Sequence, residues 1–118
     1  MKKITLIEIQ KLTNSQDSKY KYNAKFSVND KIINTKFGAK GYSDYTIHND
    51  TDRRNNYIAR HAKDLRTNDP TRAGYLSMYI LWNKKSFDAS VSDFKKRLKE
   101  YNKTGKFPKD IKDYTKKI

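Results

Sequence analysis

The fold of this chain is organised around residues 37–50, FGAKGYSDYTIHND, and the residues that follow them to His61. The segments before this stretch have strand-like patterns, and the segments after it have helix-like patterns. Gly38 and Gly41 lie three residues apart, which indicates backbone with positive φ or a close approach to another group. A loop between a sheet and a helix often carries functional residues, although an ordered connector whose tyrosines fill the core fits the same pattern. The residues that we expect to shape this loop are Gly38, Gly41, Tyr42, Asp44 and Tyr45.

Side-chain alternation predicts an antiparallel sheet in the N-terminal third of the chain. Residues 4–12 are rich in Ile and Leu, and their imperfect alternation indicates a β-bulge. Residues 20–28 alternate cleanly between apolar or aromatic and basic or polar side chains, as a half-buried strand does. Asn29 and Asp30 suit a two-residue hairpin turn, after which residues 33–37 form the return strand. The lysines of the polar face, which either follow phosphate groups or face solvent, are Lys21, Lys25 and Lys36.

Helix signals begin at residue 50. Asp50 or Thr51 is expected to cap a first helix that runs to about Leu65. One face of this helix carries charged and aromatic residues at helical spacing: Arg53, Tyr57, Arg60 and Asp64. Asp69 and Pro70 suit the N-cap and the first position of a second helix.

The apolar residues of the C-terminal half predict a buried helix followed by an amphipathic one. Residues 73–82 are apolar on almost every side, which indicates a central core helix with Trp82 as a packing residue first and as an exposed ring for base stacking second. Ser86 suits the N-cap of a third helix, in which apolar residues recur at steps of four and three from Phe87 to Tyr101. Its outward side is expected to carry Lys95, Lys96, Arg97 and Lys99. The tail from residue 107 to residue 118 fits either a short docked helix or a basic arm that orders on a polyanion.

We therefore predict an α+β fold, in which an N-terminal antiparallel sheet of about three strands packs against about three helices. At 118 residues the chain is expected to be one domain, with residues 102–118 as a candidate basic arm. Aromatic residues make up 13% of the chain, which argues against disorder. No run approaches the ~20 apolar residues of a membrane span. No secretory signal is visible, and the absence of cysteine excludes disulfides and thiolate metal sites.

The formal net charge of +14 predicts attraction to a polyanion. Residues 1–36 carry a net charge of +5, residues 37–83 carry +2 and residues 84–118 carry +7. Lysines dominate the two flanks and arginines the centre, so diffuse attraction is expected from the flanks and fixed phosphate or carboxylate contacts from the centre. The residues expected to contact nucleic acid are Lys40, Arg53, Arg54, Arg60, Lys63, Lys95, Lys96, Lys99 and Lys103.

Four segments carry a resemblance to a known family. They are residues 37–46, FGAKGYSDYT, then His48 with Asp50, residues 57–61, YIARH, and residues 81–83, LWN. Over about Tyr20 to Leu98 the chain resembles a family of small basic proteins that large double-stranded DNA viruses of the mimivirus and chlorella-virus type, and some algae, encode. The resemblance implies a viral context, with the protein in the virion interior or in the host cytoplasm or viral factory, and it supplies no mechanism.

The histidines raise the question of catalysis. His48, Asp50 and His61, with further carboxylates nearby, are residue types that can bind a divalent metal or act as a general base. Their spacing matches no metal-binding or phosphate-cradling motif. The alternative is that His48 and Asp50 cap the first helix, while His61 lies at its C-terminal end, where a cation is favoured.

Sequence alone therefore favours a non-enzymatic, sequence-nonspecific DNA-binding protein of viral type, packaged with the genome. A structural virion protein that binds an acidic partner, as a minor capsid or core component, is the second interpretation. A small metal-dependent nuclease built on His48, Asp50 and His61 is the third. No cofactor and no metal are expected under the first two.

Overall fold

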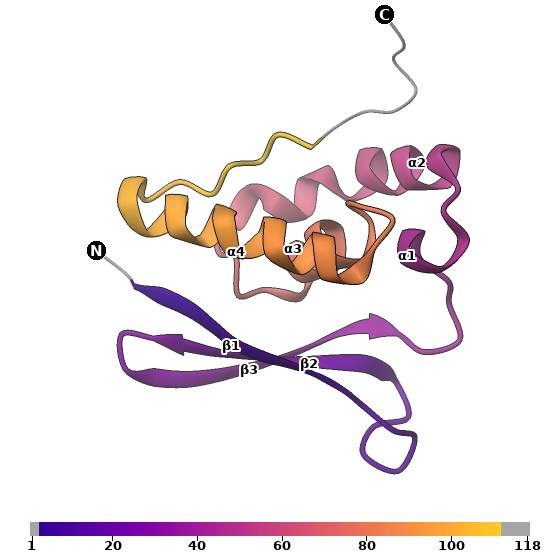
Figure 1. The fold of residues 1–118 in the computed structure, drawn as a ribbon, viewed down its shortest axis with the longest axis horizontal. Coiled ribbons are helices and arrows are strands. Elements are labelled where there is room, and N and C mark those ends of the chain that lie inside the picture. The colour runs from indigo at the N-terminus through magenta and orange to yellow at the C-terminus, as the bar shows by residue number, and fades with distance from the viewer. Residues whose placement is uncertain (1–2, 112–118) are drawn as a thin grey trace, which may run out of the picture.

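Three antiparallel strands form the N-terminal half of the fold in a computed structural model that describes residues 3–111 (Figure 1). The strands are β1 (Ile4–Lys11), β2 (Tyr20–Val28) and β3 (Lys31–Ala39), in the order β1-β2-β3. The pairing of β1 with β2 shifts between Leu6 and Glu8, which confirms the predicted bulge. The β2–β3 hairpin turns at Asn29 and Asp30, whose φ angles of 50° and 71° are those that a tight hairpin turn requires.

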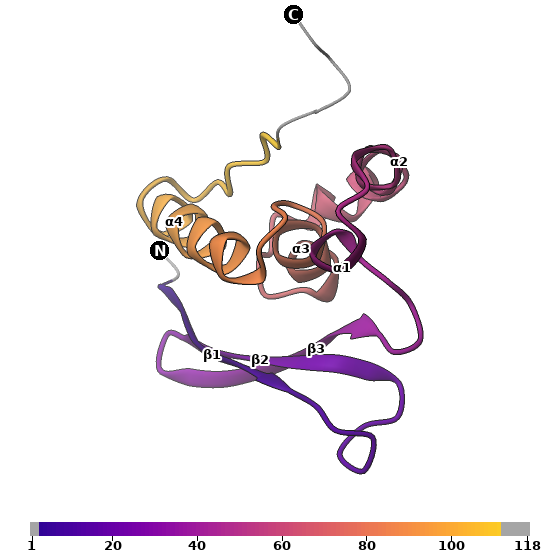
Figure 2. The ribbon, with the colours of Figure 1, turned by 45° about the vertical axis from the view of Figure 1, so that its right-hand side comes forward.

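The helices all lie on one face of the sheet, which confirms the α+β prediction (Figures 1 and 2). They are α1 (Tyr45–His48), α2 (Thr51–His61), the 3₁₀ helix η1 (Ala62–Thr67), α3 (Ala73–Leu76), the π-helical turn η2 (Ser77–Leu81) and α4 (Phe87–Thr104). In Figure 2, α4 and α2 stand on opposite sides of α3. None of the helices in residues 3–111 is both long and apolar enough to cross a bilayer.

The predicted central core helix is present as α3 continued by η2. Met78, Tyr79 and Ile80 are fully buried, together with Phe26 and Phe37 of the sheet. Burying one such side chain contributes about 1.5–3 kcal/mol, so this run anchors both layers. The backbone N–H of Trp82 donates to the Ser77 carbonyl oxygen five residues earlier, at 3.1 Å, which closes the π-helical turn. A π-helical turn inside a helix is rare, and such turns are frequent at functional sites.

Two predicted helix boundaries were wrong. The helix capped by Asp50 ends as an α-helix at His61 and continues to Thr67 only as a 3₁₀ helix. Asp69 does not cap α3, which begins three residues after Pro70 with Arg72 at the N-cap position. The Asp69 carboxylate instead accepts hydrogen bonds from the backbone N–H and hydroxyl of Thr71, at 3.0 and 2.7 Å, and so closes a turn.

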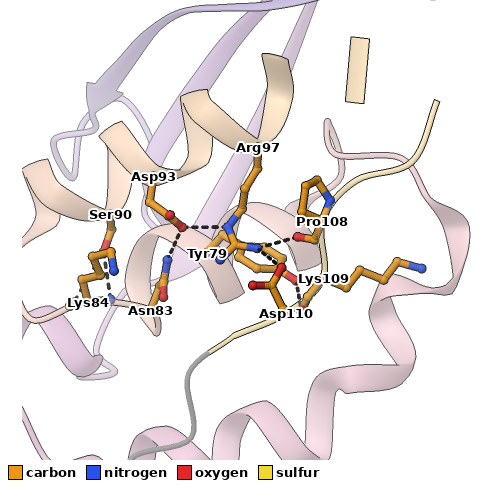
Figure 3. Close-up of polar contacts among 9 residues, drawn as sticks. All are labelled: Tyr79, Asn83, Lys84, Ser90, Asp93, Arg97, Pro108, Lys109 and Asp110. Carbon is orange, nitrogen blue, oxygen red and sulfur yellow. Dashed lines mark hydrogen bonds and ion pairs between the residues drawn. The ribbon is translucent and has the colours of Figure 1, made fainter. Parts of the chain in front are cut away.

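Arg97 was wrongly predicted to face outward from α4. Its side chain is only 13% exposed, and its guanidinium lies 4.8 Å from the centre of the Tyr79 ring. It donates to Asp93 at 2.7 Å and to the Pro108 carbonyl oxygen, and so fastens the C-terminal segment to α4 (Figure 3). That segment runs without helix from Gly105 to residue 111, with Phe107 buried in the core, and residues 112–118 of the predicted arm lie outside the described residues.

Candidate functional site

Gly38, near the end of β3, and Gly41, in the loop that follows, have the positive φ angles that the sequence predicts. Gly38 has a φ of 77° and Gly41 a φ of 85°, conformations that side chains with a Cβ rarely adopt. A Cβ added at Gly38 would stand 3.0 Å from Cδ1 of Leu81, so this glycine also permits the sheet to approach η2. A Cβ added at Gly41 would meet no atom within 4 Å. Gly38 is therefore required both for its positive φ angle and for close packing against Leu81, whereas Gly41 is required only for its positive φ angle.

Asp44 ends the loop and holds three partners from a buried position. One of its carboxylate oxygens accepts from the backbone N–H of Thr46 at 3.0 Å and from the Thr46 hydroxyl, which caps α1. The other oxygen pairs with the Lys21 ammonium at 3.0 Å. Lys21, which sequence assigned only to a basic sheet face, thus neutralises a buried carboxylate. Tyr45, the next residue, is buried in the core, as the connector interpretation of the loop predicted.

His48 and Asp50 form the cap of α2, as the structural alternative predicted. The Asp50 carboxylate accepts from the backbone N–H groups of Asp52 and Arg53, at 3.0 and 3.2 Å. Nδ1 of His48 accepts from the backbone N–H of Asp50 at 2.8 Å, so the neutral ring carries its proton on Nε2. Burial lowers the pKa of His48 below its ordinary value, and the positive charge of Arg53 lowers it further.

Four aromatic rings follow one another beside this cap, and we call them the aromatic column: His61, Tyr57, Trp82 and His48. Tyr57 stacks on Trp82 with 4.3 Å between ring centroids and an interplanar angle of 4°, and on His61 with 4.1 Å between centroids. The His48 ring lies 5.3 Å from that of Trp82. Burial raises the pKa of Tyr57 to about 12, although the nearby Ser77 hydroxyl opposes this effect. The column therefore joins α1, α2 and the end of η2 through fixed ring contacts.

Three rings of the column, His61, Tyr57 and Trp82, line a cavity of about 530 Å³, which lies between the sheet end, the loop, α2 and η2. Arg53, Tyr57 and Arg60 line it from α2, which confirms that these three share one helix face. Tyr20 and Tyr42 line it from the sheet end and the loop, and their side chains are 40% and 73% exposed. The cavity thus combines rings and cations around a space of the size that small-molecule pockets have.

The charges of the cavity do not cancel. The Lys21 and Asp44 charges offset each other, and His61 pairs with the carboxylate of Asp64 at 3.0 Å. Arg53 and Arg60 are exposed, and neither forms an ion pair with a carboxylate of residues 3–111. Two guanidinium groups are therefore available to a ligand, and guanidinium is the group that best matches phosphate or carboxylate oxygens.

The other residues that we expected to contact nucleic acid do not lie together on one surface. Arg54 is fully buried, and its Nε donates to the Asn83 carbonyl oxygen at 2.8 Å, so the prediction of a solvent-facing phosphate contact was wrong for this arginine. The Lys40 ammonium donates to Asn14 and to the Asp17 carbonyl oxygen within the β1–β2 connection. Lys63 is exposed beside a second hollow, outside the cavity. The α4 lysines lie on the opposite flank of the helical layer from α2 (Figure 2).

The structure does not assemble the alternative catalytic set. Tyr57 and Trp82 stand between His61 at one end of the aromatic column and His48 at the other. Within the described part of the chain, no three His, Asp or Glu side chains come together in a way that could hold a metal ion.

Sequence reasoning missed the roles of Trp82 and Asn83 in this region. Trp82 was expected first to pack, with an exposed ring for base stacking as the second interpretation, and it is partly exposed and forms a wall of the cavity. Asn83 is buried, and it joins Arg54 to Asp93 by accepting at its carbonyl oxygen and donating from its side-chain amide at 2.7 Å (Figure 3). A run of apolar residues indicates only burial, and this run ends at Trp82, where the chain turns toward the cavity. Neither the cavity contact of Trp82 nor the polar contacts of Asn83 could therefore be predicted from it.

Comparison with known proteins covers only part of the site, because residues 73–82 of the cavity lie outside the matched segment. Residues 10–61 match the model of a family described as a family of unknown function (DUF5754). The chain is similar to that family from the end of β1 to the end of α2, a range that contains the loop, the α2 cap and both cavity arginines. No curated protein and no solved structure matches the chain.

Proposed function

We propose that this protein is a non-enzymatic nucleic-acid-binding protein that contacts phosphate groups, expected to be those of duplex DNA, without regard to sequence. The observation that carries the proposal is the outer surface of α4, which we call the lysine face: Lys95, Lys96, Lys99 and Lys103. All four side chains are exposed, and none forms an ion pair with a carboxylate of residues 3–111. Uncompensated lysines on a regular helix are the usual source of sequence-independent attraction to phosphates.

The geometry of the lysine face suits a polyanion. Lys96, Lys99 and Lys103 are separated by three and four residues and so form one stripe along the helix. At ~1.5 Å per residue the stripe is about 10 Å long. Duplex DNA carries about six phosphate charges over that length of its axis. The stripe can therefore contact several phosphates without bending the helix or the DNA.

The test compares two variants with the same net charge. One replaces the four lysines of the lysine face with glutamine, and the control replaces Lys11, Lys19, Lys31 and Lys85, which are also exposed and lack ion pairs. Contact with about five phosphates predicts a slope near −4 to −5 for log affinity against log salt on duplex DNA. We expect the lysine-face variant to lower the magnitude of that slope by about 3 to 4, and the control to lower it less. Absence of duplex binding at ~50 mM salt would refute the proposal.

A viral setting remains part of the proposal, supported by the resemblance of residues 37–46, His48, Asp50, residues 57–61 and residues 81–83 to proteins of large DNA viruses. The proposed location is the virion interior or the host cytoplasm and viral factory, where a basic protein would offset genome charge. Detection of the protein in purified, nuclease-treated particles would support packaging, and its absence from particles would exclude it.

A structural virion role is the second candidate, and exposed apolar side chains on the sheet favour it. Ile7 is 47% exposed, Ile32 53% and Ile33 38%. A protein partner could cover these side chains, whereas nucleic acid would leave them in water. Under this alternative, Ile32→Ser would weaken capture of an acidic particle protein and leave the DNA salt slope unchanged. The reverse result would favour the nucleic-acid function.

A further inference from the structure

We propose that the cavity beside the aromatic column is a binding pocket for one unpaired nucleotide, recognised as a nucleoside 5′-phosphate. This inference rests on the proposed function, because it assigns a specific site to a protein whose lysine face supplies only general attraction. The shared chemistry is an aromatic base joined to a phosphate. The source is either the end or an extruded residue of a nucleic-acid strand, or a free nucleoside monophosphate.

The two free arginines define the phosphate end of the pocket. Arg53 and Arg60 are seven residues apart, which places them two turns apart on the same face of α2. Both line the cavity, and neither guanidinium is used by a carboxylate of residues 3–111. A phosphate group offers several oxygens to these planar donors, and its two negative charges match the two positive charges. A neutral ligand would leave the positive charges of both arginines without an anionic partner.

Two tyrosines of the cavity lining offer aromatic surface for a base. Tyr42 belongs to the loop and is 73% exposed, and Tyr20 at the start of β2 is 40% exposed. Within the described residues, neither ring is paired with another ring, whereas both faces of Tyr57 are covered by its neighbours in the aromatic column. Stacking on one aromatic side chain strengthens binding by roughly 5- to 150-fold per base and depends little on base identity. Tyr20 and Tyr42 are therefore the rings available for stacking.

The shape of the cavity selects an unpaired nucleotide. Its volume of about 530 Å³ is that of a pocket for one small molecule. Phe37 and Leu81 line it from the core, and the stacked rings of the aromatic column other than His48 form a wall that is held by ring contacts. A base within a duplex has both faces stacked and its pairing edge occupied, so it must leave the helix before it can enter such a pocket. Single-stranded ends and free nucleotides need no such step.

The decisive experiment measures binding of dAMP, of deoxyadenosine, of a single-stranded oligonucleotide and of a blunt duplex to the full chain by calorimetry. Trp82 is the only tryptophan, so its fluorescence reports occupancy of the cavity directly. We expect dAMP to bind and to change Trp82 fluorescence, and deoxyadenosine to bind at least about tenfold more weakly, because it lacks the charged hydrogen bonds.

Two variants, each with a matched control variant, separate pocket binding from general attraction. Arg53→Lys with Arg60→Lys keeps the charge but removes the planar donors, and we expect it to weaken dAMP by about ten- to a hundredfold. The matched control is Arg66→Lys with Arg72→Lys, two exposed arginines outside this cavity, and we expect less than a twofold effect. The second variant, Tyr42→Ala, should weaken dAMP and the single strand, whereas Tyr42→Phe keeps the ring and should not.

The outcomes distinguish the inference from the function on which it rests. The pocket is refuted if dAMP does not bind at millimolar concentration, or if the control arginine variant weakens dAMP binding as much as the cavity arginine variant does. Duplex binding through the lysine face is not affected by either of these results. If dAMP binds but neither polymer binds, the pocket is a site for free nucleotides and the nucleic-acid function is refuted. A single strand that competes with dAMP at the cavity identifies the strand as the source of the nucleotide.

Discussion

Gly38→Ala should destabilise the protein more than Gly41→Ala, and the structure predicts by how much. Both glycines have φ angles near 80°, so each alanine pays the cost of a left-handed conformation, about 1–2 kcal/mol. Only at Gly38 does the added methyl also meet the core, 3.0 Å from Cδ1 of Leu81 and 3.5 Å from Cβ of Lys21. Overpacking of this kind costs about 1–3 kcal/mol more.

The expected losses are therefore about 1–2 kcal/mol for Gly41→Ala and about 2–5 kcal/mol for Gly38→Ala. With an unfolding entropy of about 2.1 cal/mol/K per residue, 1 kcal/mol lowers the Tm of a chain of this length by about 4 °C. Urea titration of each variant, followed by Trp82 fluorescence and by circular dichroism, measures its free energy of unfolding. Coincident transitions of the two probes would justify a two-state treatment.

A double-mutant cycle locates the cause of the difference. Leu81→Ala removes the atom that the new methyl would meet, at a cost of about 2–5 kcal/mol in the wild-type background. If the close approach is real, the same truncation should cost less in the Gly38→Ala background, with a coupling of about 0.5–3 kcal/mol. Equal losses for Gly38→Ala and Gly41→Ala, or additive effects in the cycle, would refute the contact between the loop and η2.

Three further predictions concern single side chains. Arg54→Lys should lower stability by about 1–3 kcal/mol in urea, because the Nε donor to the Asn83 carbonyl oxygen is lost inside the fold, and it should leave duplex affinity unchanged. Asp17→Asn should destabilise at pH 7 and progressively less as the pH falls below about 3.9, because Lys36 and two backbone N–H groups lower the pKa of this carboxyl in the folded state. The contribution of Asp17 is fully present above the unfolded value of about 3.9 and is lost as the pH falls toward the much lower folded value. Spectrophotometric titration should show that Tyr57 ionises near pH 12, and Tyr57→Phe should remove this ionisation step. Because folding raises the pKa of Tyr57 above its unfolded value, the free energy of unfolding should decrease as the pH rises above about 10.

Local patterns predicted those parts of the fold that local physics controls. The alternation of residues 20–28, the Asn29–Asp30 turn and the Asp50 and Ser86 caps depend on neighbours a few residues away, and the structure confirms them. The positive φ angles of the two loop glycines were predictable for the same reason. The conformation of a residue type with one strong preference can be predicted without knowledge of its tertiary partners.

The wrong predictions depend on partners that are distant in the sequence. Arg97 was assigned to solvent because it stands among lysines on a helix, but its partners Pro108 and Asp110 come from the C-terminal segment (Figure 3). Arg54 was assigned to phosphate, but its partner is the carbonyl oxygen of Asn83, 29 positions later. A charged side chain carries no local sign of whether its partner is water, a ligand or a buried carbonyl group.

Three segments of the sequence, residues 37–46, 57–61 and 81–83, meet at the cavity. Gly38 belongs to the first segment, and its missing Cβ leaves room for Leu81 of the last one. Trp82 stacks on Tyr57 of the middle segment, so the last two segments meet in the aromatic column. These contacts bring together parts of the chain more than 20 residues apart, and each one shapes a wall of the same cavity. The convergence of these segments on one cavity, beside two arginines that pair with no carboxylate of residues 3–111, favours a binding role for it.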